Sequence, residues 1–250
     1  MVNSTRPDGR SFYDPRPFNV DLNPLRTGPS CRLSVGEASS TSSSPGERTS
    51  VIALVYFSVD NKNRNTVGSY HRPTFEVYVR PVTGPVKGYI RAYECMLLKC
   101  LQSMVDGSSL GRVLVSVRLQ ILEESSGLFA ACLNALITAM IVAGLPLRET
   151  PHAIQIGILH RNDSPGFIVE PTSEELRMQC SSAITMLCSP KSGNILFLSI
   201  DHGCGCYDAG LQANMEAVSR KIAELRLSYL NKKYREAFEA ARISFEANGS

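Results

Sequence analysis

The sequence lacks the features that mark a membrane or secreted protein. None of its apolar runs approaches the roughly 18 residues that a membrane-spanning helix needs. Residues 1–17, MVNSTRPDGRSFYDPRP, lack the apolar core of a secretory signal peptide. These absences predict a soluble, intracellular protein that does not associate with a membrane.

A strong excess of charge of one sign is also missing. Lys and Arg number 26 against 23 Asp and Glu, which gives a formal net charge of +3. This bias permits contact with an acidic polymer but falls short of the basic surface of a dedicated nucleic-acid-binding domain. Hydrophobic residues make up 43% of the chain, enough for one sizeable core. The simplest interpretation is a single compact α/β domain.

The eight cysteines have no spacing typical of a structural zinc site. Several lie inside apolar segments, where a thiol behaves as a small core residue, so we expect all eight to be reduced. Cys204 and Cys206, close to His202, could hold a soft metal, but no second ligand pair accompanies them. A glycine-rich turn with incidental thiols is the favoured interpretation, and no cofactor or metal is expected.

Residues 1–48 differ in composition from the remainder. They are rich in Ser, Pro and Gly, and residues 39–45 form a low-complexity Ser-rich stretch that cannot bury enough surface to order itself. We therefore expect an N-terminal segment with a flexible insertion at 1–48, followed by a folded domain at 49–250.

Hydrophobic periodicity predicts an alternation of strands and helices in that domain. Residues 51–57 are apolar on both faces, as in a central strand, and residues 112–122 alternate strictly. Residues 128–143 are apolar almost all round, which predicts a buried helix, and an amphipathic helix is expected from Leu211 onward. Further strands are expected at 75–80, 153–159, 166–169, 183–187 and 194–200, and a further helix at 90–105.

Three motifs carry a family resemblance. Residues 6–10, Arg-Pro-Asp-Gly-Arg, precede a strand at 49–56; residues 119–135 read LQILEESSGLFAACLNA and lead to Ala-Gly-Leu-Pro at 143–146; residues 168–176 read IVEPTSEEL. Together they resemble RNase PH-like proteins, in particular subunits of the eukaryotic exosome core ring. The resemblance implies an α/β (α+β) RNase PH fold, similar to ribosomal protein S5 domain 2, with mixed sheets around a buried central helix and a long C-terminal helix.

The resemblance also implies a degenerate phosphate site. Active relatives carry an arginine in the loop before the central helix, where backbone N–H groups and a guanidinium can hold the phosphate dianion. Here that loop reads Ser-Gly-Leu-Phe at 126–129, so Leu128 or Phe129 occupies the arginine position. Phosphate is therefore expected to bind poorly, and no catalytic residue is assigned.

Active relatives carry two acids six positions apart, which can act as general acid and metal ligands. The matching positions here are Glu170 and Leu176, with Glu174 and Glu175 close by. A solvated loop is the favoured interpretation. The alternative is that Glu170, Glu174 and Glu175 rebuild a metal site and retain weak phosphorolytic or metal-dependent 3′-to-5′ exonuclease activity.

A group of basic residues lies in segments that line the central channel in the family. Each residue alone is typical of an ordinary surface charge, but as a group they are expected to contact RNA phosphates. These residues are Lys62, Arg64, Arg80, Lys87 and Arg91.

The resemblance thus implies a non-catalytic, RNA-binding ring subunit that supports 3′-to-5′ RNA processing and degradation, including that of ribosomal RNA. Its expected partners are other RNase PH-like subunits, cap subunits and single-stranded RNA. Its expected locations are the nucleus, nucleolus and cytoplasm.

Overall fold

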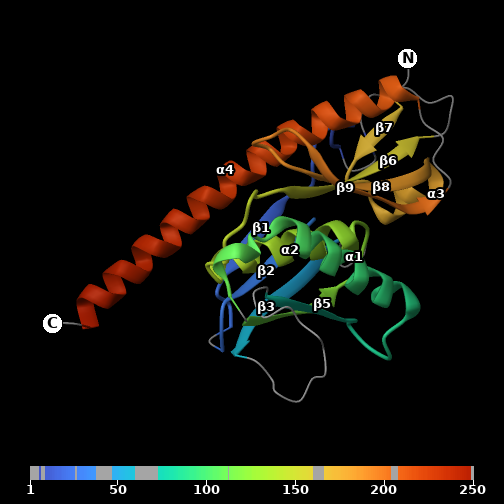
Figure 1. The fold of residues 1–250 in the computed structure, drawn as a ribbon. Coiled ribbons are helices and arrows are strands. Elements are labelled where there is room, and N and C mark those ends of the chain that lie inside the picture. Colours follow the sequence, from blue (N-terminus) through green and yellow to red (C-terminus); the bar gives the residue numbers. More distant parts are fainter. Residues whose placement is uncertain are drawn as a thin grey trace.

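The computed structural model describes residues 6, 9–25, 27–37, 47–59, 73–111, 113–159, 166–203 and 208–248. These residues form two β-sheets with helix α2 (Leu128–Val142) packed between them (Figure 1). The described part also contains α1 (Gly88–Met104), the short 3-10 helix η1 (Gly107–Ser109), α3 (Ser173–Met178) and α4 (Ala209–Asn248).

The first sheet has the strand order β1-β2-β3-β5-β4. Neighbouring strands are antiparallel, except that β4 and β5 run parallel and are connected through α1. The strands are β1 (Phe18–Leu22), β2 (Ser30–Val35), β3 (Thr49–Val59), β4 (Thr74–Arg80) and β5 (Val113–Glu123).

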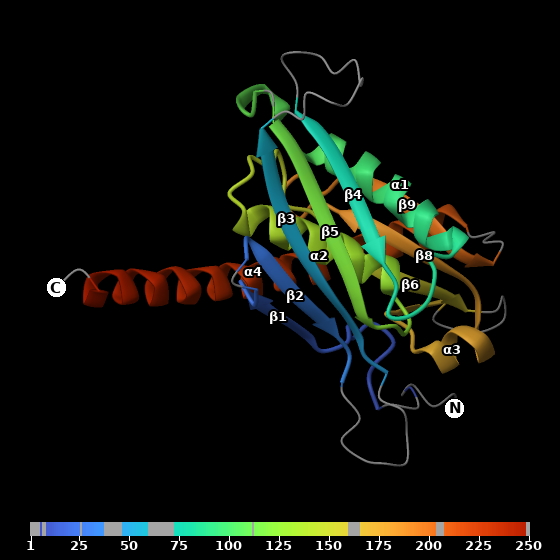
Figure 2. The same ribbon diagram turned by 90° about the horizontal axis from the view of Figure 1, so that it is seen from below.

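Strict alternation of apolar and polar side chains along its strands gives this sheet one buried and one open face. On β5 the side chains of Val115, Val117 and Leu119 are at most 1% exposed, whereas Arg118 and Gln120 point to the other side and are exposed. Helices α1 and α2 cover the buried face, and seen from below the opposite face carries no helix (Figure 2).

The second sheet has the order β7-β6-β8-β9 and is antiparallel throughout. Its strands are β6 (His152–Leu159), β7 (Phe167–Val169), β8 (Cys180–Cys188) and β9 (Ile195–Gly203). Helix α2 contacts both sheets, and every residue from Leu128 to Met140 is buried. Apolar character around the whole helix, which predicted burial, is thus explained by a sheet on either side.

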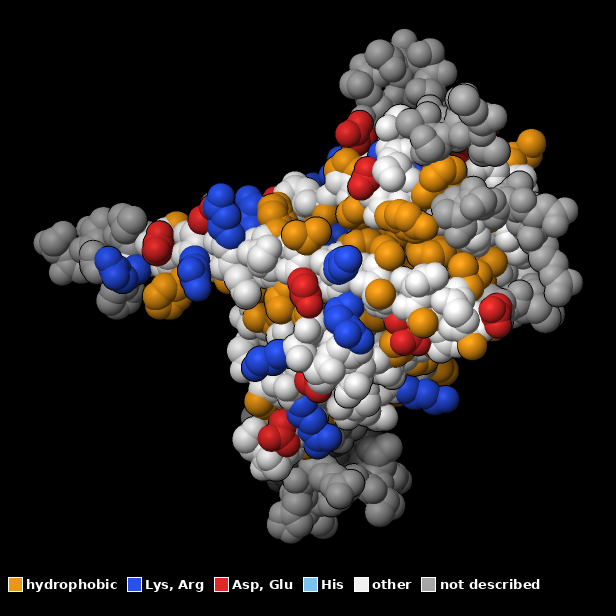
Figure 3. Space-filling view, turned by 90° about the horizontal axis from the view of Figure 1, so that it is seen from above, with side chains coloured by type: hydrophobic (Ala, Val, Ile, Leu, Met, Phe, Trp, Pro, Cys, Tyr) orange, Lys and Arg blue, Asp and Glu red, His pale blue; other side chains and the backbone are white. Residues whose placement is uncertain are grey.

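Helix α4 packs on β6, β8 and β1 and then runs out of the body (Figure 1). Side chains of both charge signs line its projecting part (Figure 3). The described residues contain no helix that is both long and apolar enough to cross a membrane.

The predicted strands and helices from residue 49 onward are confirmed, but residues 1–48 contain two strands that were not predicted. β2 pairs with β3 and β1 pairs with β2, so both strands belong to the same sheet as the domain that follows. Three of their inward side chains, Val20, Cys31 and Leu33, are at most 2% exposed. The predicted Ser-rich insertion lies outside the described residues.

Candidate functional site

A hollow of about 300 Å³ opens where β5 ends and α2 begins. The loop after β5, the first turn of α2, helices α1 and α3, and strands β6, β8 and β9 surround it. Its lining residues are Tyr93, Glu124, Ser125, Ser126, Gly127, Leu128, Phe129, Gln155, Ser173, Leu176, Arg177, Ala183 and Asp201.

The start of α2 is fixed by its N-cap, Gly127. This residue has φ = +77°, a left-handed conformation that glycine adopts without steric cost. The preceding Ser126 places its hydroxyl 2.8 Å from Gln155 Oε1 and 2.5 Å from the carbonyl of Pro171, which ties the loop to the second sheet. The helix therefore begins at a rigid position beside the hollow.

The two residues at the expected arginine position face the core. Leu128 is 5% exposed and Phe129 is 1% exposed. The ring centroid of Phe129 lies 4.9 Å from that of Tyr93 and 5.9 Å from that of Phe197. Aromatic packing of this kind stabilises a core, and neither side chain offers a donor to phosphate.

The charge in the hollow is unfavourable for an anion. Glu124 and Asp201 contribute carboxylates, and among the described lining residues Arg177 supplies the one basic side chain, which is exposed. Burial raises the pKa of Asp201 above its ordinary value, although hydrogen bonds from Thr185, Ser199 and Gln155 favour the carboxylate. The hollow is therefore mildly acidic.

Of the two positions six residues apart, Leu176 lines the hollow and Glu170 does not. Glu170 is 6% exposed and pairs with Arg226 of α4, whose Nη1 lies 2.6 Å from Oε1. Burial alone would raise the pKa of Glu170, but Arg226, together with the Arg16 amide and guanidinium, lowers it below its ordinary value. Glu170 is thus a buried structural carboxylate.

The backbone of Glu170 is held as firmly as its side chain. Its φ of +46° is left-handed, a conformation that costs a non-glycine residue about 1–3 kcal/mol. Its carbonyl oxygen accepts hydrogen bonds from Arg16 Nε at 3.1 Å and from Arg6 Nη2 at 3.2 Å. These contacts from the N-terminal residues keep the strained turn in place.

The two neighbouring glutamates lie in a helix, so the predicted solvated loop is wrong. Glu175 forms a capping box with Thr172 at the start of α3. Its side chain is 2% exposed and paired with Arg6, at 2.8 Å from Nε and 2.6 Å from Nη2. Glu174 is exposed. Within the described part of the chain, no cluster of three His, Cys, Asp or Glu side chains could hold a metal ion.

A polar contact network surrounds His152 beneath the same turn. Arg226 Nη1 lies 3.1 Å and Asn134 Nδ2 lies 3.2 Å from His152 Nε2. The Asn134 orientation is fixed because its amide also pairs with the backbone N–H and carbonyl of Ala153. Since both neighbours donate, Nε2 accepts and the imidazole is neutral. Burial, followed by the charge of Arg226, lowers the pKa of His152 well below its ordinary value.

The structure describes three of the five basic residues that the sequence groups together. Lys62 and Arg64 lie outside the described residues. Arg80 ends β4 and borders the open face of the first sheet, whereas Lys87 is the N-cap of α1 and Arg91 lies exposed in its first turn. Lys87 Nζ lies 5.9 Å from the ring centroid of Tyr89.

Three informative residues were not identified from the sequence. Asp201 lies in β9, directly after the mainly apolar residues 195–200, and an acid within such a strand was a signal that the sequence offered. Arg226 occupies a buried place on α4, while the neighbouring Leu225 is 66% exposed. Arg118 lies on the exposed side of β5 and carries no local motif.

Sequence comparison finds similar proteins, although no family model matches the chain. The rice (Oryza sativa subsp. japonica) exosome complex exonuclease RRP46 homolog is 26% identical over 252 residues, covering 92% of this chain and 98% of that protein. Exosome complex component RRP46 of Saccharomyces cerevisiae is 29% identical over 140 residues, covering 53% of this chain and 61% of that protein.

Solved structures share the fold. The crystal structure of rice Rrp46 has a TM-score of 0.72 at 24% identity and covers 90% of this chain and 100% of that chain. The Archaeoglobus fulgidus exosome with RNA bound to its active site has a TM-score of 0.70 at 19% identity. The match covers 91% of this chain and 93% of that chain. In sequence this chain is therefore similar to RRP46, ribosomal RNA processing protein forty-six, and it has the RNase PH fold of exosome subunits.

Proposed function

We propose that this chain is a subunit of an exosome core ring that holds RNA without degrading it by phosphorolysis. Its likeness to rice RRP46 over nearly its whole length supports the ring assignment. The observation that carries the non-catalytic part is the hollow at the start of α2, which Leu128, Phe129 and Leu176 line.

A phosphorolytic site must hold inorganic phosphate beside a polyanionic strand. A charge-assisted arginine contact contributes about 1.5–3 kcal/mol to such binding, and apolar side chains supply none of it. Glu124 and Asp201 add negative charge to the same hollow. The N-terminal N–H groups of α2 are left to attract phosphate largely by themselves.

The alternative function is a nuclease that uses Glu170, Glu174 and Glu175. It requires carboxylates that can turn toward a metal or a leaving oxygen. Glu170 and Glu175 are each buried and bound to an arginine, and Glu174 is exposed. This arrangement favours a structural role for the acids and supports the non-catalytic proposal.

The proposed partners are other RNase PH-like ring subunits, cap subunits and single-stranded RNA. Lys62, Arg64, Arg80, Lys87 and Arg91 are the proposed RNA contacts, since cationic side chains position a strand through its phosphates without reading its sequence. Nucleus, nucleolus and cytoplasm are the proposed locations, in keeping with ribosomal RNA processing and RNA degradation.

Affinity capture tests the assembly directly. The tagged full-length chain, expressed in its own cells and purified at low salt, should recover several RNase PH-like proteins in equal amounts, as identified by mass spectrometry. Recovery of no such protein would contradict the proposal.

A further inference from the structure

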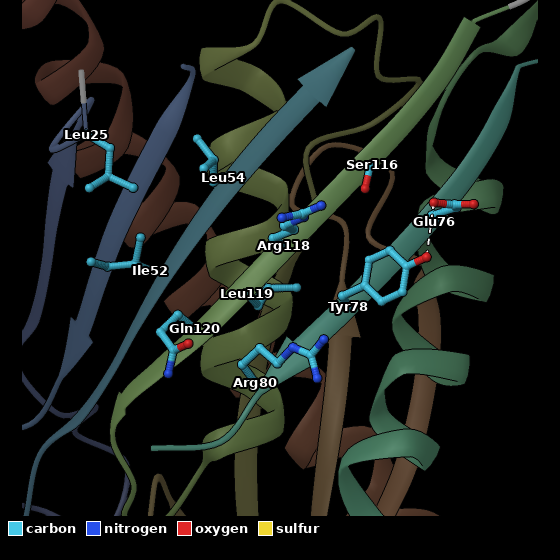
Figure 4. A pocket seen from close by; sticks show the side chains of 10 residues that line it. All are labelled: Leu25, Ile52, Leu54, Glu76, Tyr78, Arg80, Ser116, Arg118, Leu119 and Gln120. Atoms are coloured by element: carbon cyan, nitrogen blue, oxygen red, sulfur yellow. Dashed lines mark hydrogen bonds between the residues drawn. The ribbon is translucent and has the colours of Figure 1, made fainter. Parts of the chain in front are cut away.

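The open face of the first sheet contains a groove of about 480 Å³ that the ring assignment does not explain. Figure 4 shows its side chains, which come from β3, β5 and β4 and from the loop after β1. The lining residues are Leu25, Ile52, Leu54, Glu76, Tyr78, Arg80, Ser116, Arg118, Leu119 and Gln120.

Strand pairing arranges the polar side chains in three rows. Glu76 lies opposite Ser116, Tyr78 opposite Arg118, and Arg80 opposite Gln120. Successive rows are about 7 Å apart, because side chains on one face of a strand alternate with a rise of about 3.3 Å per residue. The groove thus has an acid at one end, a tyrosine beside an arginine in the middle and a second arginine at the other end (Figure 4).

The two guanidinium groups keep their charge available. Within the described residues neither Arg80 nor Arg118 belongs to an ion pair. Arg118 Cζ lies 5.3 Å from the ring centroid of Tyr56, a side chain that is 37% exposed. Stacking on an aromatic ring orients a guanidinium without neutralising it.

Other side chains are fixed before any ligand binds. Tyr78 donates from its hydroxyl to Glu76 Oε2 at 3.2 Å. The Gln120 amide donates to the carbonyls of Pro81 and Ile121, each at 3.0 Å. A binding surface that is already ordered loses less conformational entropy when a ligand arrives.

We propose that this groove holds a short segment of single-stranded RNA. Arg80 and Arg118 contact phosphates, a base stacks on Tyr78, and Glu76 with Ser116 receives ribose hydroxyl or base amino groups. Aromatic residues and arginines on an open sheet bind single strands in this manner. The inference rests on the proposed function, which brings RNA to the chain.

A protein partner fits the groove less well than RNA. A close protein interface would remove the two arginines and Glu76 from water, and burying charged groups is costly unless each finds a matched partner. RNA contacts can remain wet, and a polyanion supplies a counter-charge for both arginines.

Fluorescence anisotropy with a labelled 20-nucleotide RNA of mixed sequence tests the proposal on the full chain. The double variant Arg80→Gln with Arg118→Gln should flatten the slope of log affinity against log salt by about 1.4, since each phosphate contact on a single strand contributes about 0.7. Tyr78→Leu should lower the affinity about tenfold at fixed salt through lost stacking. The matched control, Lys232→Gln with Arg235→Gln on the exposed part of α4, should bind RNA with the affinity and salt slope of the wild type.

Affinity capture of partners by the same variants separates the possible failures. If RNA binding by both groove variants equals that of the control, the groove does not hold RNA, whether or not ring subunits are recovered. If the double arginine variant loses partner proteins but keeps its salt slope, the groove is a protein interface and the inference is overturned. If the wild type recovers no ring subunits, the proposed function itself fails, irrespective of the groove.

Discussion

Glu170 and Arg226 form a buried, two-pronged ion pair, with Nη1 2.6 Å from Oε1 and Nη2 2.7 Å from Oε2. The pair joins the turn after β7 to the long helix α4. Arg226 also lies over the ring of Phe18 in β1, with Cζ 4.8 Å from the centroid. One arginine therefore connects the C-terminal helix, the second sheet and the first strand.

Arg226→Leu should lower the free energy of unfolding by about 3–5 kcal/mol, because it leaves the Glu170 carboxylate buried without its counter-charge. The double variant Glu170→Leu with Arg226→Leu should lose less stability than the single variant Arg226→Leu. Urea unfolding monitored by circular dichroism measures both, and Arg235→Leu on the exposed part of α4 should change stability by no more than about 0.5 kcal/mol. If Arg226→Leu proved as stable as Arg235→Leu, the ion pair would contribute nothing to the free energy of unfolding.

Stability should fall as the pH drops below about 6.5, the ordinary pKa of histidine. The unfolded chain takes up a proton at His152 there, whereas burial and Arg226 keep the folded imidazole neutral. One such proton decreases the free energy of unfolding by at most about 1.4 kcal/mol per pH unit. Unfolding between about pH 7.5 and 5.5 measures the slope, and this range lies above the pKa of Glu170. His152→Gln should remove this contribution. If the variant and the wild type had the same slope of unfolding free energy against pH, His152 would titrate alike in the folded and unfolded chain.

Phe129 is expected to act on folding alone. Phe129→Ala should cost about 3–5 kcal/mol of stability, the usual loss for a large core aromatic. A residue that binds phosphate would instead alter phosphate affinity at nearly constant stability. Thermal unfolding and phosphate titration of the same variant distinguish the two, and Phe57→Ala, at a side chain that is 48% exposed, provides the comparison.

The isolated chain should gain stability from its partners. Binding that is restricted to the folded state raises the thermal midpoint in proportion to the logarithm of free partner concentration. Differential scanning fluorimetry with increasing amounts of purified ring subunits checks this expectation. A midpoint that stays constant at saturating partner would contradict ring assembly by this chain.

The sequence predicted those helices and strands in which burial sets the spacing of apolar residues. Helix α2 and strand β5 were predicted within one or two residues, since one is apolar all round and the other alternates strictly. Strands β1 and β2 were missed because they are short and lie in a segment rich in Ser, Pro and Gly. β2 is stabilised by pairing with β3, a long-range contact that no local pattern records, and β1 by pairing with β2.

The sequence named three residues that line one hollow in the structure, Leu128, Phe129 and Leu176. That this hollow is a degenerate phosphate site stays a prediction. Glu170 does not line the hollow, because Arg226, which lies 56 positions further along the chain, pairs with its side chain. An arginine on a helix is usually exposed, so only the folded structure shows its buried role.

The most direct test of the account is the release of nucleoside diphosphates from single-stranded RNA by the full chain, with and without inorganic phosphate. Because Leu128 and Phe129 stand where an arginine would bind phosphate, and because Glu124 and Asp201 repel it, the two conditions should give the same background. Diphosphate release that requires phosphate, and that is lost in Asp201→Asn or Glu170→Gln, would contradict the account and identify the chain as an active phosphorolytic nuclease.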